Sequence, residues 1–139
     1  MTLAVDTSAA VALLMSSHVA HRVVRRHLRG QDLVLTQHSL AETYSVLTRL
    51  PGDARVAPAD AVRLIHGNFG PPALLPAATA GAVPEVLAEL NIVGGAVYDG
   101  LVGLAANAHD LTLATRDLRA AATYDALGVD VLAIPDDNV

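Results

Sequence analysis

Short apolar runs alternate with amphipathic segments along the whole chain of 139 residues. The apolar runs, rich in Leu, Val and Ala and bounded by polar or turn residues, predict strands. We expect these strands at Thr2–Val5, Leu33–Leu35, Ala73–Leu75, Leu111–Ala114 and Val129–Ile134. The amphipathic segments predict helices at Ser8–Met15, Val19–Arg29, Ser39–Leu50, Pro58–Asn68, Thr79–Leu90, Ala96–Ala108 and Leu118–Leu127. Pro84 lies far inside one of these segments, so that helix begins either after Thr79 or at Pro84 itself.

The alternation of strands and helices predicts an α/β fold with a central parallel sheet of four to five strands flanked by helices. The length fits a single domain over residues 1–139. In open parallel sheets, ligands bind beyond the carboxyl ends of the strands, where the strand order reverses. Asp6 directly follows the first predicted strand, and Asp117 closely follows the strand at Leu111–Ala114. The sequence therefore places two acids where a site is expected.

Composition narrows the function classes. The chain has no Cys, which excludes disulfides, a thiolate nucleophile and Cys-bound zinc, and which fits a reducing cytoplasm. The N-terminus lacks a basic segment and no apolar run is long enough for a membrane span, so we expect neither a signal peptide nor a membrane anchor. The net charge of −5 argues against a protein that coats nucleic acid by charge alone. It does not exclude a nuclease whose site is itself acidic.

Four acids interrupt or adjoin apolar segments: Asp6, Glu42, Asp99 and Asp117. Buried carboxylates are costly unless they are paired or bind a metal, and several close together would raise one another's pKa. A hard divalent cation such as Mg²⁺, or Mn²⁺ in its place, would remove that conflict, because such ions prefer oxygen ligands.

Three of the four acids also have structural interpretations. Asp6 precedes Thr7-Ser8 at a helix start and could be an N-cap. Glu42 and Ser39 fit the Ser-x-x-Glu capping box, and Asp117 could cap or stabilise the helix that it precedes. Asp99 has no such interpretation, since it lies in an otherwise apolar helix with no cationic residue within one turn.

Basic residues gather in the segment from 18 to 29, where Arg22, Arg25, Arg26 and Arg29 alternate with three His residues. This pattern indicates either a solvated helix face or a surface that contacts RNA or a protein partner. The remaining His residues, His38, His66 and His109, are isolated and are expected to be structural or on the surface. No HExxH pair, P-loop or Asp-x-Asp motif is present, so a zinc hydrolase, a P-loop NTPase and a dehalogenase-like phosphatase are disfavoured.

Taken in order, the four acidic segments resemble the motifs of the PIN-domain ribonucleases, and within them the VapC-type toxins of bacterial toxin–antitoxin pairs. The similar segments are Val5-Asp6-Thr7-Ser8-Ala9, Ser39-Leu40-Ala41-Glu42-Thr43-Tyr44, Val97-Tyr98-Asp99-Gly100-Leu101-Val102 and Leu113-Ala114-Thr115-Arg116-Asp117-Leu118. The end of the chain, from Tyr124 to Val131, is also similar to the closing helix and strand of that family.

The resemblance implies a PIN-like fold, a homodimer in the bacterial cytoplasm, and a cognate VapB-like antitoxin whose basic residue enters the acidic site. It also implies a Mg²⁺-dependent endoribonuclease in which metal-activated water hydrolyses RNA phosphodiester bonds. The four acids would be the metal ligands, with Thr7 and Thr115 as supporting contacts. Arg116 joins the arginines of the 18–29 segment as a candidate RNA or antitoxin contact. The alternative is a non-catalytic α/β interaction module whose acids act as caps.

Overall fold

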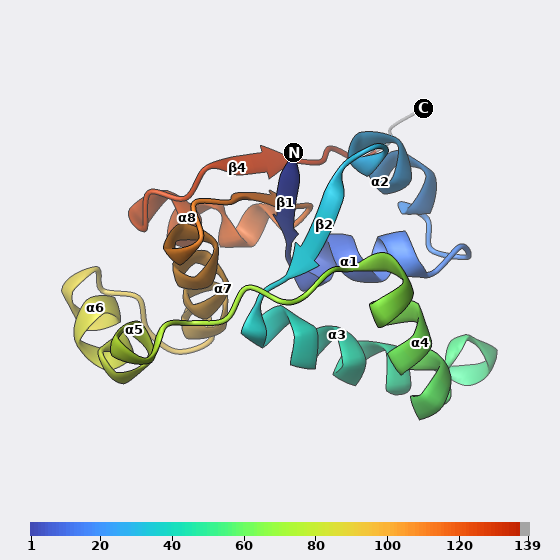
Figure 1. Ribbon diagram of the computed structural model, residues 1–139, viewed down its shortest axis with the longest axis horizontal. Helices are drawn as coiled ribbons and strands as arrows, with labels where there is room; N and C mark the ends of the chain where they lie inside the picture. Colours follow the sequence, from blue (N-terminus) through green and yellow to red (C-terminus); the bar gives the residue numbers. More distant parts are fainter. Residues whose placement is uncertain (137–139) are drawn as a thin grey trace.

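The computed structural model describes residues 1–136 and has a four-stranded sheet with helices packed around it (Figure 1). The strands are β1 (Thr2–Val5), β2 (Asp32–Leu35), β3 (Thr112–Thr115) and β4 (Val131–Ala133). The α-helices are α1 (Thr7–Leu14), α2 (His21–Leu28), α3 (Gln37–Thr48), α4 (Pro58–Asn68), α5 (Ala77–Gly81), α6 (Val83–Glu89), α7 (Ala96–Ala108) and α8 (Ala121–Ala126). Two 3₁₀ turns, η1 (Gly52–Ala54) and η2 (Leu118–Ala120), complete the described elements.

All pairings in the sheet are parallel, and the strand order is β2-β1-β3-β4. The chain passes from β1 outward to β2 and then returns to the other side of β1 to form β3. The strand order therefore reverses between β1 and β3, which are adjacent, with Val5 opposite Ala114. This reversal creates a crevice beyond the carboxyl ends of these two strands, the position where α/β folds bind ligands. The predicted α/β fold class is confirmed.

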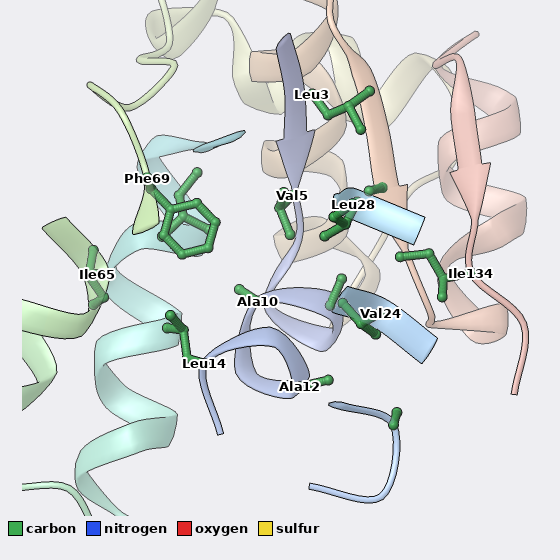
Figure 2. Close-up of a cluster of buried hydrophobic side chains, with 14 of the residues drawn as sticks. Leu3, Val5, Ala10, Ala12, Leu14, Val24, Leu28, Ile65, Phe69 and Ile134 are labelled. Carbon is green, nitrogen blue, oxygen red and sulfur yellow. The ribbon is translucent and has the colours of Figure 1, made fainter. Parts of the chain in front are cut away.

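Alternation along the strands divides the core between the two faces of the sheet. Leu3 and Val5 on β1 point to a face covered by α1, α2 and α4, and Figure 2 shows them beside Leu28, Phe69 and Ile134. Ala4, between them, belongs to a second cluster on the opposite face, formed mainly by residues of α7, β3 and α8. Both faces of β1 are therefore buried, which holds its carboxyl end in a fixed position.

One expectation about the middle of the chain was wrong. Ala73–Leu75 is not a strand, because only Ala73 pairs, through an isolated bridge with Thr36. For the segment Thr79–Leu90, the structure agrees with the alternative of a helix that begins near Pro84. Pro84 lies in the first turn of α6, where its missing N–H costs nothing, and the short helix α5 precedes it.

In the part of the chain that the structure describes, no helix combines the length and the apolar character needed to cross a membrane. The sequence also predicts a short acidic tail over Pro135–Val139, and its last three residues lie outside the described residues.

Candidate metal centre

Asp6 is the most deeply buried of the four acids, with 5% of its surface exposed. It follows β1 and caps α1, since its Oδ1 accepts hydrogen bonds from the Ala9 amide at 3.2 Å and from the Ser8 hydroxyl at 2.6 Å. The Tyr124 hydroxyl donates to Oδ2 at 3.1 Å. Burial raises the pKa of Asp6, although the hydrogen bonds to the carboxylate oppose that rise. The N-cap interpretation is thus confirmed, and the same carboxylate faces the crevice end of β1.

Ser8 connects the ends of the two central strands. Its hydroxyl donates to Asp6, accepts from the backbone amide of Arg116 at 3.0 Å, and lies 3.5 Å from the Thr115 hydroxyl. Thr115 in turn accepts a hydrogen bond from the Asp117 amide at 3.0 Å. This chain of hydroxyls fixes Asp6 and Asp117 relative to each other. Thr115, one of the two predicted supporting residues, therefore makes a hydrogen bond to the backbone of Asp117. The buried hydroxyl of the other, Thr7, has no hydrogen-bond partner among the described residues.

Asp117 lies just past β3, next to the end of β1. Its Oδ1 accepts a hydrogen bond from the Arg119 amide at 2.9 Å and so caps η2. The guanidinium of Arg119 lies 3.5 Å from the same oxygen but is almost fully exposed, so solvent weakens that pair. Asp117 is therefore a cap of a short 3₁₀ turn and a carboxylate at the crevice at once.

Glu42 reaches the site from α3, which begins where β2 ends. The capping box of α3 pairs Thr36 with Ser39, not Ser39 with Glu42, so the structural interpretation of Glu42 was wrong. The Ser39 hydroxyl accepts a hydrogen bond from the Thr36 amide at 2.8 Å and also donates one to the Val5 carbonyl at 3.1 Å. This second bond ties the start of α3 to the end of β1, and it leaves the Glu42 carboxylate free to face the acids.

Asp99 lies in the first turn of α7. Burial raises its pKa from 3.8 to about 6, and the negative charges of Asp117, Asp6 and Glu42 add to that rise in decreasing order. Such an effect falls off with distance. The three other acids, distant in sequence, therefore lie within electrostatic range of Asp99.

The donors gathered here suit a hard divalent cation. Within residues 1–136, no three Asp, Glu or His side chains are drawn together tightly enough to enclose an ion directly. Carboxylates that repel one another are expected to stand apart, and Mg²⁺ keeps several of its waters and takes only one or two carboxylates directly. An all-oxygen set with a raised Asp99 pKa fits such an ion, held partly through water.

Two neighbours of the acids were missed by sequence reasoning. His38 was expected to be structural or on the surface, but its Nε2 lies 3.4 Å from Glu42 Oε2, and its ring stacks on Tyr98. The spacing of His38 and Glu42 by four residues on a helix was the available signal. Tyr124, whose hydroxyl holds Asp6, lies 118 residues away in sequence, and no local pattern pointed to it.

The candidate basic contacts lie beside this pocket or on α2. Arg116 is partly buried and pairs with Asp136 at 3.6 Å. On α2, Val23, Val24 and Leu28 face the core. The exposed side carries Arg22, Arg25, Arg26 and Arg29, none of which makes an ion pair with a described residue, and these four with His21 line a shallow groove of about 250 Å³.

Comparison with known proteins gives a consistent result. The PIN domain family matches residues 3–126. Ribonuclease VapC27 of Mycobacterium tuberculosis is 53% identical over 130 residues, which cover 94% of this chain and 95% of that protein. Ribonuclease VapC40 of the same species is 42% identical over 134 residues, covering 93% and 96%.

The fold also has solved counterparts. VapBC2 from Rickettsia felis, crystallised with a DNA fragment from its promoter, includes a chain that superposes with a TM-score of 0.67 at 14% identity. The superposition covers 96% of this chain and 98% of that one. At this level of identity the match shows the fold alone, and it confirms the PIN-like architecture.

Proposed function

The chain belongs to the VapC-type ribonucleases of the PIN-domain family, and on that premise we propose that it is a metal-dependent endoribonuclease, the toxin of a bacterial toxin–antitoxin pair. Asp6, Glu42, Asp99 and Asp117 are proposed to hold the metal, with Mg²⁺ as the natural ion and Mn²⁺ as a substitute. The substrate is RNA, and the reaction is hydrolysis of a phosphodiester bond. We assign the activity to the cytoplasm, which a chain without Cys suits.

One observation carries this proposal: burial, and after it the charges of three acids from three other segments, raise the pKa of Asp99. A stable fold does not need four mutually repelling carboxylates in one pocket, because that arrangement costs free energy without a cation. Capping accounts for Asp6 and Asp117, and Glu42 pairs with His38 on α3, but Asp99 has no structural role. The non-catalytic module therefore leaves Asp99 unexplained.

Each side chain has a defined task in this proposal. The bound ion would activate the attacking water and neutralise charge on the scissile phosphate. Ser8, the Ala9 amide and Tyr124 orient both oxygens of Asp6. Thr115 fixes the backbone at Asp117. Thr7, whose hydroxyl is buried beside Asp6, is retained as a candidate supporting residue without an observed contact.

The arginines of α2 are proposed to hold the RNA backbone or an antitoxin. Arg22, Arg25, Arg26 and Arg29 concentrate positive charge on one surface of a protein with a net charge of −5. His18 precedes α2, and burial and then the Arg116 charge lower its pKa, so Arg116 lies within electrostatic range of it. Phosphates that leave the pocket past Arg116 would therefore meet these side chains next.

The toxin is proposed to form a homodimer and to bind a cognate antitoxin. An acidic pocket attracts a guanidinium, which offers five donors in a planar fork and stays charged. We propose that a basic residue of the antitoxin enters among the four carboxylates and competes with Mg²⁺ for the same oxygens.

The test is cleavage of RNA by the purified chain in Mg²⁺, with and without EDTA, compared with Asp99→Asn. We expect cleavage in Mg²⁺ that EDTA abolishes and that the variant lacks while it remains folded. Products should carry 5′-phosphates. Cleavage that persists in excess EDTA would refute metal dependence, and a folded wild-type chain that never cleaves RNA would favour the non-catalytic module.

A further inference from the structure

The most exposed of the Phe and Tyr side chains in the described residues, Tyr98, lies next to the candidate acids. The protein has four Phe, Tyr and Trp residues in total: three Tyr and one Phe. Phe69 and Tyr124 are buried in the core, and Tyr44 is 38% exposed. Tyr98 is 56% exposed and immediately precedes Asp99 in the first turn of α7. Aromatic rings normally stabilise a protein through burial of their apolar surface, and an exposed ring beside charged side chains gains little of that stabilisation.

His38 supports the ring of Tyr98 from behind. The two rings stack with centroids 5.3 Å apart and planes 18° from parallel. The His38 side chain is itself only 24% exposed and lies beside Glu42 on α3, which packs against α7. One face of Tyr98 is therefore covered by a held imidazole, and its exposed surface is left mainly to the other face and the edge. The pair forms a flat platform whose orientation is fixed by two helices.

A stacking surface meets a specific need at this site. The pocket is negatively charged, and an RNA phosphate must approach it against that charge. The two arginines that flank Asp117 in sequence add little net positive charge, because Arg116 lies beside Asp136 and Arg119 beside Asp117. A nucleobase carries no charge at neutral pH, so stacking adds affinity without repulsion. Single-stranded RNA is held in this way by exposed aromatic side chains.

We propose that the free face of Tyr98, supported by His38, stacks on the nucleobase adjacent to the scissile phosphate and selects unpaired RNA there. This inference rests on the proposed ribonuclease function and adds a residue that determines specificity. Tyr98 would act in binding and not in the bond-breaking step. A base held in a helix cannot lie flat on an external ring, so paired RNA would be a poor substrate.

The experiment uses a short RNA that the wild-type chain cleaves once, chosen by mapping 5′ ends in total RNA. Kinetic constants are measured for the wild type, Tyr98→Phe, Tyr98→Ala and the control Tyr44→Ala. Tyr44 is an exposed tyrosine beside the groove between α3 and α4. We expect Tyr98→Ala to raise KM roughly 5- to 100-fold, from the measured range of base–aromatic stacking, with kcat little changed. Tyr98→Phe and Tyr44→Ala should match the wild type.

A second measurement identifies the base. Abasic nucleotides replace each position around the cleavage site in turn. An abasic nucleotide at one position should raise the KM of the wild type by a similar factor. The same abasic nucleotide should not raise the KM of Tyr98→Ala further. A KM that is unchanged in Tyr98→Ala, while the wild type cleaves RNA, would overturn the role of Tyr98 and leave the proposed function standing. Absence of cleavage by the wild type would refute both.

Two further readouts separate base stacking from an effect on the metal site or on a protein interface. The Mn²⁺ concentration for half-maximal rate should be the same in Tyr98→Ala, since a shift would mean that the variant disturbs Asp99. Sedimentation and antitoxin affinity should also be unchanged. If Tyr98→Ala lost the dimer or antitoxin binding, and abasic nucleotides still raised its KM as they do in the wild type, the ring would belong to a protein interface and the proposal would be contradicted.

Discussion

Replacing Asp99 by Asn should stabilise the metal-free protein while it abolishes cleavage. Burial and three neighbouring carboxylates raise the Asp99 pKa from 3.8 to about 6. Because the folded-state pKa is the higher one, folding favours the protonated acid, and ionised Asp99 destabilises the protein above about pH 6. The neutral amide has nearly the same shape and removes that cost.

The size of the effect follows from the pKa. A displacement from 3.8 to about 6 corresponds to roughly 3 kcal/mol at neutral pH. Asp99 is only partly buried, so solvent screening reduces this to about 1–1.5 kcal/mol. For a domain of this size, that gain raises the melting temperature by roughly 3–6 °C.

The assay is thermal and urea unfolding of both proteins in EDTA across the acidic to neutral range. The gap in the free energy of unfolding should be largest at neutral pH and should close as the pH falls from about 6 to below 3.8, where Asp99 in the wild type is protonated in both states. Asp32→Asn is the control, since Asp32 lies exposed at the other end of the sheet. A gap that does not change with pH, or an Asp99→Asn protein that is less stable, would refute the reasoning.

The same contacts give four further tests. Mg²⁺ or Mn²⁺ should support cleavage and Ca²⁺ should do so poorly, since its longer, looser coordination displaces the water; equal rates in Ca²⁺ would contradict this. Tyr124→Phe removes the donor to Asp6 Oδ2 and should cost about 1–2 kcal/mol of stability and several-fold in rate, measured by unfolding and single-turnover kinetics; an unchanged rate would mean that Asp6 needs no such orientation. Arg25→Ala should lower the salt dependence of RNA binding by about 0.7 in the log–log slope, whereas Arg63→Ala, paired with Asp60 on α4, should not; equal slopes would remove α2 from the RNA path. Replacing the basic residue of the antitoxin that enters the site by Ala should weaken inhibition more than binding, measured by cleavage and calorimetry; full inhibition would mean that the antitoxin covers the RNA path instead.

Sequence patterns could place two of the candidate acids because strand ends are local features. Asp6 directly follows a short apolar run and Asp117 closely follows another, and the parallel order of the sheet places such ends together. Pro58–Asn68 and Ala96–Ala108 also match the observed helices, because Pro at a first turn and Gly before a helix mark their starts.

The errors in the sequence-based prediction arose where contacts between distant segments determine the local structure. Ala73 follows two prolines and precedes Leu74-Leu75-Pro76, so the segment completes one bridge to the edge of β2 and then leaves the sheet. Helix α3 begins at Gln37, earlier than the predicted Ser39, so Thr36 is its N-cap and Ser39, not Glu42, occupies the third helical position of the capping box. Ser39 also bonds to Val5 on another element. His38 and Tyr98 meet only because α3 packs on α7. Contacts of this kind, between side chains or backbones of different elements, leave no periodic signal in the sequence.

Mn²⁺ binding measured by calorimetry and electron paramagnetic resonance tests the central claim most directly. The account predicts that the wild-type chain binds Mn²⁺, that Asp6→Asn, Glu42→Gln, Asp99→Asn and Asp117→Asn each weaken binding about tenfold or more, and that Asp32→Asn at the opposite end of the sheet binds as the wild type does. Binding that none of the four substitutions weakens would contradict a metal centre formed by these carboxylates.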